Sequence, residues 1–128
     1  METANNFYLF LEYCDQGDLS NFIRKRSSLE KYENPRNRDV SKTHFLNELE
    51  ASYVVRDIVQ GLAHLTEKCG IMHRDIKLDN ILVKTRRSYR DVIHSPNTSP
   101  AGKLRDLPID AFEFKLGDLG LAKSKVQQ

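Results

Sequence analysis

Residues 73–80 read His-Arg-Asp-Ile-Lys-Leu-Asp-Asn and place three kinds of chemical group within one short loop. Asp75 supplies a carboxylate, Lys77 a cation and Asn80 a neutral oxygen donor, while Asp118 supplies a second carboxylate further along the chain. Phosphoryl transfer needs a held triphosphate, metal ions that neutralise its oxygens and a group that orients the incoming hydroxyl. Mg²⁺ prefers oxygen ligands and takes only one or two of them from the protein. These residues therefore predict a magnesium–phosphate site.

Three predicted elements position these groups. Apolar residues recur at helical spacing over residues 45–68, and Gly70 suits a left-handed cap, so a long helix should end just before the loop. The β-branched and apolar residues 81–83 predict a short strand directly after it. Residues 112–116 alternate apolar with charged side chains, which predicts a half-buried strand leading to Asp118.

The remaining segments carry other patterns. Residues 7–14 are rich in aromatic and apolar side chains and predict a largely buried strand, ended by a turn at 15–18. A short helix is expected from Leu19, followed by a polar loop or insertion up to residue 43. Residues 85–111 contain two Ser-Pro pairs and lack periodicity, which predicts a surface excursion.

The motif His73-Arg74-Asp75-x-Lys77-x-x-Asn80 resembles the catalytic loop of eukaryotic Ser/Thr protein kinases at every defining position. The resemblance implies an α+β fold class: a partial protein-kinase-like fold with the hinge strand between the lobes, the long helix, the catalytic loop and short strands of the large lobe. Residues 1–128 would form one partial kinase domain, from the hinge to the Asp-Leu-Gly motif at 118–120. Insertions are expected at about 25–43 and 85–111.

The resemblance also assigns roles to the matching residues. Asp75 would accept or orient the proton of the substrate hydroxyl, and Lys77 would touch the γ-phosphate of ATP, as in Ser/Thr rather than Tyr kinases. Asn80 belongs to this catalytic set and would also hold Mg²⁺. Asp118 would be the other magnesium ligand, while His73 would pack behind the loop as a structural residue. ATP and Mg²⁺ are the implied cofactors.

A second group of residues would bind the nucleotide base and ribose. Backbone groups of Glu12 and Cys14 would bond adenine, and Leu82 would lie beneath it. Asp18 falls where relatives place an acid near the ribose, but a role as the N-cap of the following helix is an equal alternative, and one residue can serve both.

Two features bear on the subfamily. The metal-binding motif reads Asp-Leu-Gly at 118–120 instead of Asp-Phe-Gly, which keeps its apolar character and its carboxylate. Residues 115–123 and 13–19 resemble NIMA-related kinases, with autophagy-initiating kinases as a close alternative.

No Gly-rich loop and no Ala-Pro-Glu motif occur in these 128 residues. We therefore expect a kinase fragment that is inactive alone, within a protein that transfers phosphate from Mg-ATP to a Ser or Thr hydroxyl of a protein substrate. The alternative is a truncated, kinase-like interaction protein without catalysis. Nucleic-acid binding through short basic clusters is a third and weaker hypothesis.

Composition agrees with an ordinary globular domain. The chain is 39% hydrophobic and 30% charged, with a net charge of +2. No apolar run approaches the roughly 20 residues that cross a bilayer, and the start does not resemble a secretory signal. The two cysteines, Cys14 and Cys69, form no ligand pair. We expect an intracellular setting, cytoplasmic or nuclear, with no membrane or nucleic-acid partner; the pattern leaves the oligomeric state open.

Overall fold

The computed structural model describes residues 2–3, 6–28, 46–96, 104 and 106–124. None of its helices is long and apolar enough to cross a membrane. In chain order, its elements are β1 (Glu2–Thr3), β2 (Asn6–Phe7), β3 (Gly17–Asp18), α1 (Leu19–Ser28), α2 (Glu48–Ala63), the π-helical turn η3 (His64–Lys68), β4 (Ile71–Met72), the 3₁₀ turn η4 (Leu78–Asn80), β5 (Ile81–Thr85), the 3₁₀ turn η5 (Arg87–Tyr89), α3 (Arg90–His94), the 3₁₀ turn η6 (Ile109–Ala111), β6 (Phe112–Leu116) and β7 (Lys123–Ser124).

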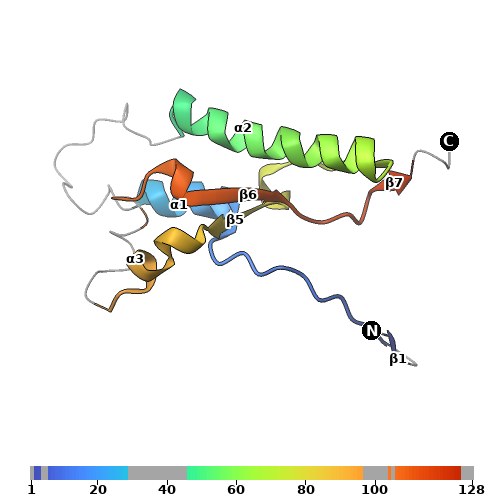
Figure 1. Ribbon diagram of the computed structural model, residues 1–128, viewed down its shortest axis with the longest axis horizontal. Helices are drawn as coiled ribbons and strands as arrows, with labels where there is room; N and C mark the ends of the chain where they lie inside the picture. Colours follow the sequence, from blue (N-terminus) through green and yellow to red (C-terminus); the bar gives the residue numbers. More distant parts are fainter. Residues whose placement is uncertain (1, 4–5, 29–45, 97–103, 105, 125–128) are drawn as a thin grey trace.

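A three-stranded antiparallel sheet in the order β3-β5-β6 lies at the centre of the structure. Alternate residues of β5 are buried, and Val83 lies opposite Phe114 of β6 in the buried layer. Helix α2 runs along the same layer and contacts β6 (Figure 1). The predicted strands at 81–83 and 112–116 are therefore confirmed as β5 and β6, with successive side chains pointing to opposite faces of the sheet.

Helix α2 begins at a capping box. The Asn47 side chain accepts a hydrogen bond of 2.9 Å from the Glu50 N–H, and the Glu50 carboxylate accepts one of 3.0 Å from the Asn47 N–H. The helix continues into η3 and ends before Gly70, whose φ of +64° is left-handed. The predicted long helix is confirmed over residues 48–68, and its glycine cap at Gly70. Residues 46 and 47 precede the helix, and residue 45 lies outside the described part.

Helix α1 confirms the short helix expected from Leu19 and packs against the sheet. The Phe22 ring is fully buried and meets the Phe112 ring edge-on, with 4.8 Å between the centroids. Arg26 at the end of α1 forms an ion pair of 2.9 Å with Glu50 of α2. The predicted insertion at about 25–43 starts too early, because α1 continues to Ser28, and its remaining residues 29–43 lie outside the described part of the chain.

Residues 8–14 do not form the predicted buried strand. Phe10 is 84% exposed and Leu11 82%, and the segment runs from the sheet out to the β1–β2 pair (Figure 1). No described strand pairs with it. A β-strand needs a neighbour that takes up its backbone hydrogen bonds, so an apolar composition alone was insufficient, and the prediction of a largely buried strand over residues 7–14 is wrong for residues 8–14.

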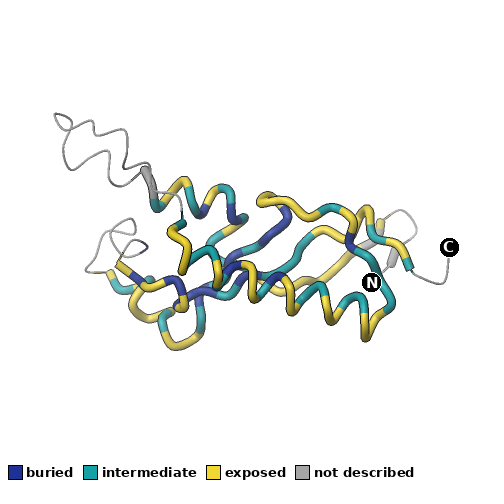
Figure 2. Tube along the Cα trace, turned by 90° about the horizontal axis from the view of Figure 1, so that it is seen from above, coloured by how far each residue is buried: buried dark blue, intermediate teal, exposed yellow. Residues whose placement is uncertain are grey.

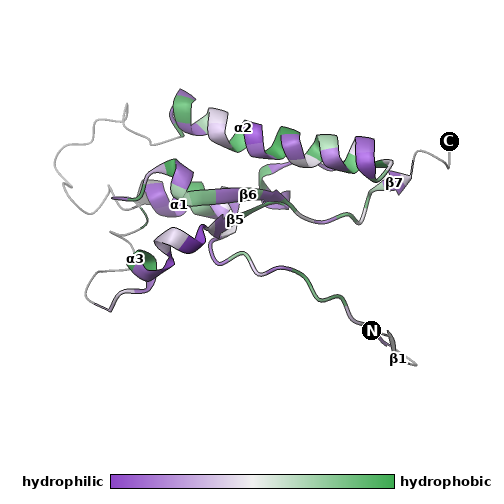
Figure 3. Cartoon of the chain, in the orientation of Figure 1, coloured by the Kyte–Doolittle hydropathy of each residue, from purple (hydrophilic) through white to green (hydrophobic). Residues whose placement is uncertain are grey.

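The segment 85–111 is not wholly a surface excursion either. Leu104, Leu107 and Ile109 are buried in the core. Figure 2 shows buried stretches of the trace between exposed ones, and Figure 3 shows hydrophobic and hydrophilic residues alternating along α2. Its start, at η5 and α3, is mostly exposed.

Candidate active site

The loop between β4 and β5 brings Asp75, Lys77 and Asn80 together. The Asn80 side-chain nitrogen donates hydrogen bonds to a carboxylate oxygen of Asp75 at 2.8 Å and to the Asp75 carbonyl at 3.0 Å. The Lys77 Nζ lies 3.3 Å from the same carboxylate oxygen. Asn80 is only 7% exposed, so the amide is a fixed support for the carboxylate, while Lys77 reaches into solvent.

His73 joins this loop to the strand that precedes Asp118. Its ring is 2% exposed, with Nε2 2.8 Å from the Gly117 carbonyl and Nδ1 3.3 Å from the Asp75 backbone nitrogen. Because the Asp75 N–H is a donor, Nδ1 must accept and Nε2 must carry the proton. The Gly117 N–H donates back to the Asn80 carbonyl at 2.8 Å. Two hydrogen bonds, His73 to the Gly117 carbonyl and the Gly117 N–H to the Asn80 carbonyl, therefore hold the two loops side by side.

Backbone strain occurs once in each of these loops. Arg74 has a φ of +65° and Asp118 a φ of +54°, and they are the only non-glycine residues with positive φ in the described part of the chain. Such conformations are costly for residues with a Cβ and gather at functional sites. The Arg74 Nε donates to the Leu121 carbonyl at 2.7 Å, and the Asp118 carboxylate accepts the Gly120 N–H at 2.9 Å.

The oxygen donors of this region fit Mg²⁺. Both hydrogen bonds of the Asn80 side-chain nitrogen go to Asp75, so its amide oxygen is the group left for a metal. The Asp118 carboxylate is exposed on the adjoining segment. No described group of three or more His, Cys, Asp or Glu side chains could hold a metal ion. An amide and a single carboxylate suit an ion that keeps several waters and binds substrate phosphates.

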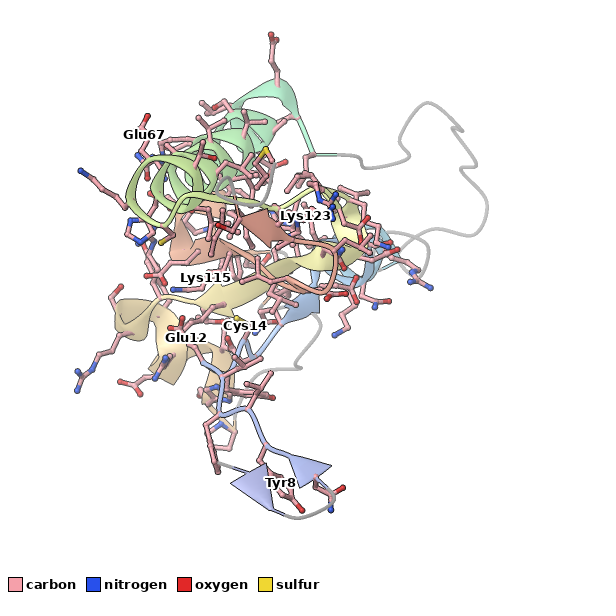
Figure 4. All side chains as sticks on the ribbon, turned by 90° about the vertical axis from the view of Figure 1, so that its right-hand side faces the viewer. Tyr8, Glu12, Cys14, Glu67, Lys115 and Lys123 are labelled. Atoms are coloured by element: carbon pink, nitrogen blue, oxygen red, sulfur yellow. The ribbon has the colours of Figure 1, made fainter. Side chains whose placement is uncertain are left out.

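Glu12 contacts the half-buried face of the sheet, the face that carries Leu82, Lys84 and Lys115. Its carboxylate pairs with Lys84 of β5 and, at 3.0 Å, with Lys115 of β6 (Figure 4). Hydrogen bonds from Lys84 and Lys115 lower the pKa of Glu12, and the bond to Glu12 raises the pKa of Lys115. Burial, followed by the nearby Glu12 charge, raises the pKa of the Cys14 thiol. Glu12 thus attaches an otherwise exposed segment to the sheet.

Leu82 of β5 and Asp18 of β3 lie directly opposite each other in the strand pair. Leu82 packs on Gly117, where an added Cβ would lie 3.0 Å from the Leu82 Cδ1. The Asp18 carboxylate accepts hydrogen bonds from the Asn21 backbone, at 2.7 Å, and from the Asn21 side chain, which lower its pKa. Asp18 therefore caps α1, as one of the two sequence interpretations held.

The structure thus forms two adjoining groups from the residues singled out in the sequence. Asp75, Lys77 and Asn80 lie together, and Gly117 links them to Asp118. Glu12, Asp18 and Leu82 belong to the β3–β5 side, with Cys14 beside them, and the Leu82–Gly117 contact joins both groups.

Sequence reasoning missed Asp15. Its carboxylate accepts hydrogen bonds of 2.7 Å from both the backbone nitrogen and the hydroxyl of Thr85. Partial burial raises the pKa of Asp15, but the bonds from Thr85 and Gln16 outweigh it, so the pKa lies below its ordinary value. Residues 15 and 85 are 70 positions apart, and no local pattern pairs them; only the turn chemistry of residue 15 was visible.

Comparison with known proteins identifies the class. The model of the protein kinase domain family matches residues 1–128, and the chain belongs to that family. Its relatives are Ser/Thr kinases. The chain is 32% identical over 142 residues to the serine/threonine-protein kinase atg1 of Aspergillus oryzae, with 96% of this chain and 14% of the relative covered. It is 37% identical over 136 residues to ATG1 of Debaryomyces hansenii, with 95% and 14% covered.

A third relative, ATG1 of Pyricularia oryzae, is 30% identical over 138 residues and covers 96% of this chain. The chain spans 13–14% of the length of these relatives. All three carry the name of one Ser/Thr kinase, whereas a NIMA-related subfamily stays a prediction from residues 13–19 and 115–123.

Proposed function

We propose that this chain supplies the catalytic loop and part of the nucleotide-binding surface of an ATP-dependent Ser/Thr protein kinase. The observation that carries the proposal is the Asp75 carboxylate, held at 2.8 Å by a buried amide and at 3.3 Å by an exposed ammonium group. A carboxylate fixed in this way can orient a hydroxyl, because it does not have to reorganise when the substrate arrives.

Each residue has one task in this proposal. Asp75 accepts a hydrogen bond from the substrate Ser or Thr hydroxyl and takes its proton. Lys77 moves from the carboxylate onto the γ-phosphate, since its side chain is 53% exposed and flexible. Asn80 and Asp118 hold the metal through oxygen atoms. Mg-ATP would supply the phosphoryl group, with ADP as the leaving group, and the metal would offset the charge of the phosphate oxygens.

The same proposal assigns the nucleotide to the half-buried face of the sheet. Backbone groups of Glu12 and Cys14 bind adenine, Leu82 lies under the base, and Asp18 meets the ribose while it caps α1. The support is the contact of Leu82 with Gly117, which places this face directly beside the segment that carries Asp118.

The decisive experiment measures phosphate transfer from labelled ATP to a Ser/Thr peptide by the intact protein. We expect Asp75→Asn to lower the turnover number by about a thousandfold or more, since general-base and positioning effects are lost together. Asp79→Asn is the matched control, because this exposed carboxylate lies in the same loop and outside the proposed set. Equal activity of the Asp75 variant and the wild type would refute the proposal.

We further propose that residues 1–128 form one partial kinase domain, with insertions at about 25–43 and 85–111, and that they have no turnover when isolated. The support is the wide exposure of Leu9, Phe10 and Leu11, at 70%, 84% and 82%, beside the proposed nucleotide site. The same apolar surface favours a second candidate, a non-catalytic kinase-like interaction protein. Absence of any turnover in the intact wild-type protein would favour that candidate.

A further inference from the structure

We propose that Asp15 and Thr85 form a clamp that positions the backbone of residues 12–14 for nucleotide binding, which makes both of them positioning residues for the proposed reaction. The inference rests on the proposed function, because residues 12–14 are its adenine-binding segment. Neither side chain is part of the proposed catalytic or nucleotide-binding set.

The clamp is a closed set of hydrogen bonds. Thr85 donates its backbone N–H to one carboxylate oxygen of Asp15 and its hydroxyl to the other, both at 2.7 Å. The Gln16 side chain donates to Asp15 at 2.9 Å and to the Thr85 hydroxyl at 3.0 Å. Thr85 has no exposed surface. Hydrogen bonds to a carboxylate in a site sheltered from water are strong and directional.

The register of the sheet explains why the clamp lies here. In the β3–β5 pair, Gly17 lies opposite Val83, and the Gln16 N–H donates to the Val83 carbonyl at 3.1 Å. Extension of this register by two positions, past Gln16 and Lys84, places Asp15 opposite Thr85. The strand pair ends before that point, and the Asp15 carboxylate takes the place of a backbone carbonyl as the acceptor for Thr85.

This replacement fixes the path of the chain just before it. Asp15 directly follows Cys14, and the Cys14 carbonyl accepts the Gly17 N–H at 3.3 Å in the turn between the clamp and β3. The backbone at Cys14 is therefore held by two contacts: its own carbonyl is bonded to Gly17, and the next residue, Asp15, is bonded to Thr85. A shift of Asp15 away from Thr85 would move the backbone groups that are to meet adenine.

The second contact between residues 12–14 and the sheet, made by Glu12, is weaker than the Asp15 clamp. Glu12 is 48% exposed and shares its carboxylate between Lys84 and Lys115, so salt and water screen these ion pairs. The Asp15 carboxylate is half-buried and accepts short hydrogen bonds from Thr85, which is fully buried, and from Gln16. It therefore constrains the position of residues 12–14 more strongly than the Glu12 ion pairs do.

The test uses steady-state kinetics of the intact protein and binding of the fluorescent nucleotide mant-ATP. Thr85→Val keeps the side-chain shape and removes the hydroxyl, so we expect KM for ATP and the Kd of mant-ATP to rise about tenfold, the scale of one charge-assisted hydrogen bond. The turnover number at saturating ATP should stay within about twofold, because the reacting groups are untouched. Thr85→Ser should restore KM.

Asp57→Asn is the matched control. Asp57 accepts the backbone N–H of Phe114 at 3.2 Å, so it performs the same task on another strand of this sheet, away from residues 12–14. If Thr85→Val and Asp57→Asn lower the melting temperature alike and neither changes KM for ATP, the clamp is only structural and the inference is wrong. If Thr85→Val does not fold, Gln16→Ala replaces it in the test. This variant removes one donor to the clamp and should also raise KM for ATP. An unchanged KM in Gln16→Ala would overturn the inference.

The outcome is separable from that of the proposed function. Activity that survives in Asp75→Asn would refute the catalytic assignment, whatever the clamp variants do. A raised Kd for mant-ATP in Thr85→Val supports the clamp without any measurement of turnover.

Discussion

His73 and Gly117 are joined by a hydrogen bond of 2.8 Å between the imidazole Nε2 and the glycine carbonyl, across 44 positions of the chain. The opposite ring nitrogen accepts the Asp75 N–H at 3.3 Å. One buried ring thus connects the residue proposed as catalytic base to the segment that carries a proposed metal ligand. The geometry of the two loops depends on this ring.

We expect His73→Phe to destabilise the protein and to lower its activity. The phenyl ring fills the buried site but leaves the Gly117 carbonyl and the Asp75 N–H without their partner, at a cost of about 1–3 kcal/mol for each unsatisfied group. Thermal unfolding and turnover of the intact protein measure the two effects. His94→Phe is the control, since His94 is exposed at the end of α3. Wild-type stability in His73→Phe would contradict the assigned role.

Asn80→Ala should show whether Asn80 supports the Asp75 carboxylate and the metal, or only stabilises the loop. Loss of the amide frees the Asp75 side chain and removes an oxygen ligand, so we expect turnover to fall by about a hundredfold or more and the magnesium requirement to rise. The measurement is the initial rate as a function of Mg²⁺ concentration. Asp79→Ala lies in the same turn and should leave both quantities near wild type; a magnesium dependence unchanged in Asn80→Ala would exclude the proposed ligand.

Stability should fall in acid through Asp15. Its pKa in the folded protein lies below the ordinary value of 3.8, so its contribution is complete above that value and is lost as the pH falls through the folded pKa. The measurement is thermal unfolding of the wild type and Thr85→Val from about pH 7 down to about pH 3. The difference between their melting temperatures should narrow at the acid end, and a constant difference would contradict the cause given for the shift.

Gly61→Ala should stabilise the protein slightly. Glycine in a helix interior costs about 1 kcal/mol relative to alanine. An added Cβ would lie 3.2 Å from the Leu116 Cδ1, the end of a flexible, half-buried side chain that can move by a few tenths of an ångström. We expect a rise of about 0.5 kcal/mol in the free energy of unfolding, measured by urea denaturation. Gly61→Val should lower the free energy of unfolding, because its additional methyl groups crowd Leu116 and a β-branched side chain is restricted in a helix.

The predictable part of the fold was the part in which local pattern and tertiary environment agree. Residues 112–116 alternate between apolar and charged side chains, and Phe112 and Phe114 are the buried ones, while the apolar run at 81–83 begins the buried strand β5. Helix α2 carries both its capping residues and its apolar faces in its own sequence. Residues 8–14 show the reverse case. Their composition suits a buried strand, but burial and pairing depend on neighbours that no local pattern specifies.

The candidate site followed the same division. Asp75, Lys77 and Asn80 lie within six positions of one another, so their grouping was visible in the loop itself. Contacts such as Asp15 with Thr85 and Glu12 with Lys115 join residues far apart in the chain, and each carboxylate alone looks like an ordinary surface residue. Only the register of the sheet brings these partners together.

The left-handed conformations of Arg74 and Asp118 have a consequence for protein engineering. A screen that selects only for heat resistance would favour glycine or asparagine at both positions, since each relieves a strained backbone. Such a screen would remove the Arg74 contact with Leu121 and the Asp118 carboxylate. The most heat-resistant clones would then be the ones with damaged chemistry, so libraries built on this scaffold should keep both codons unchanged.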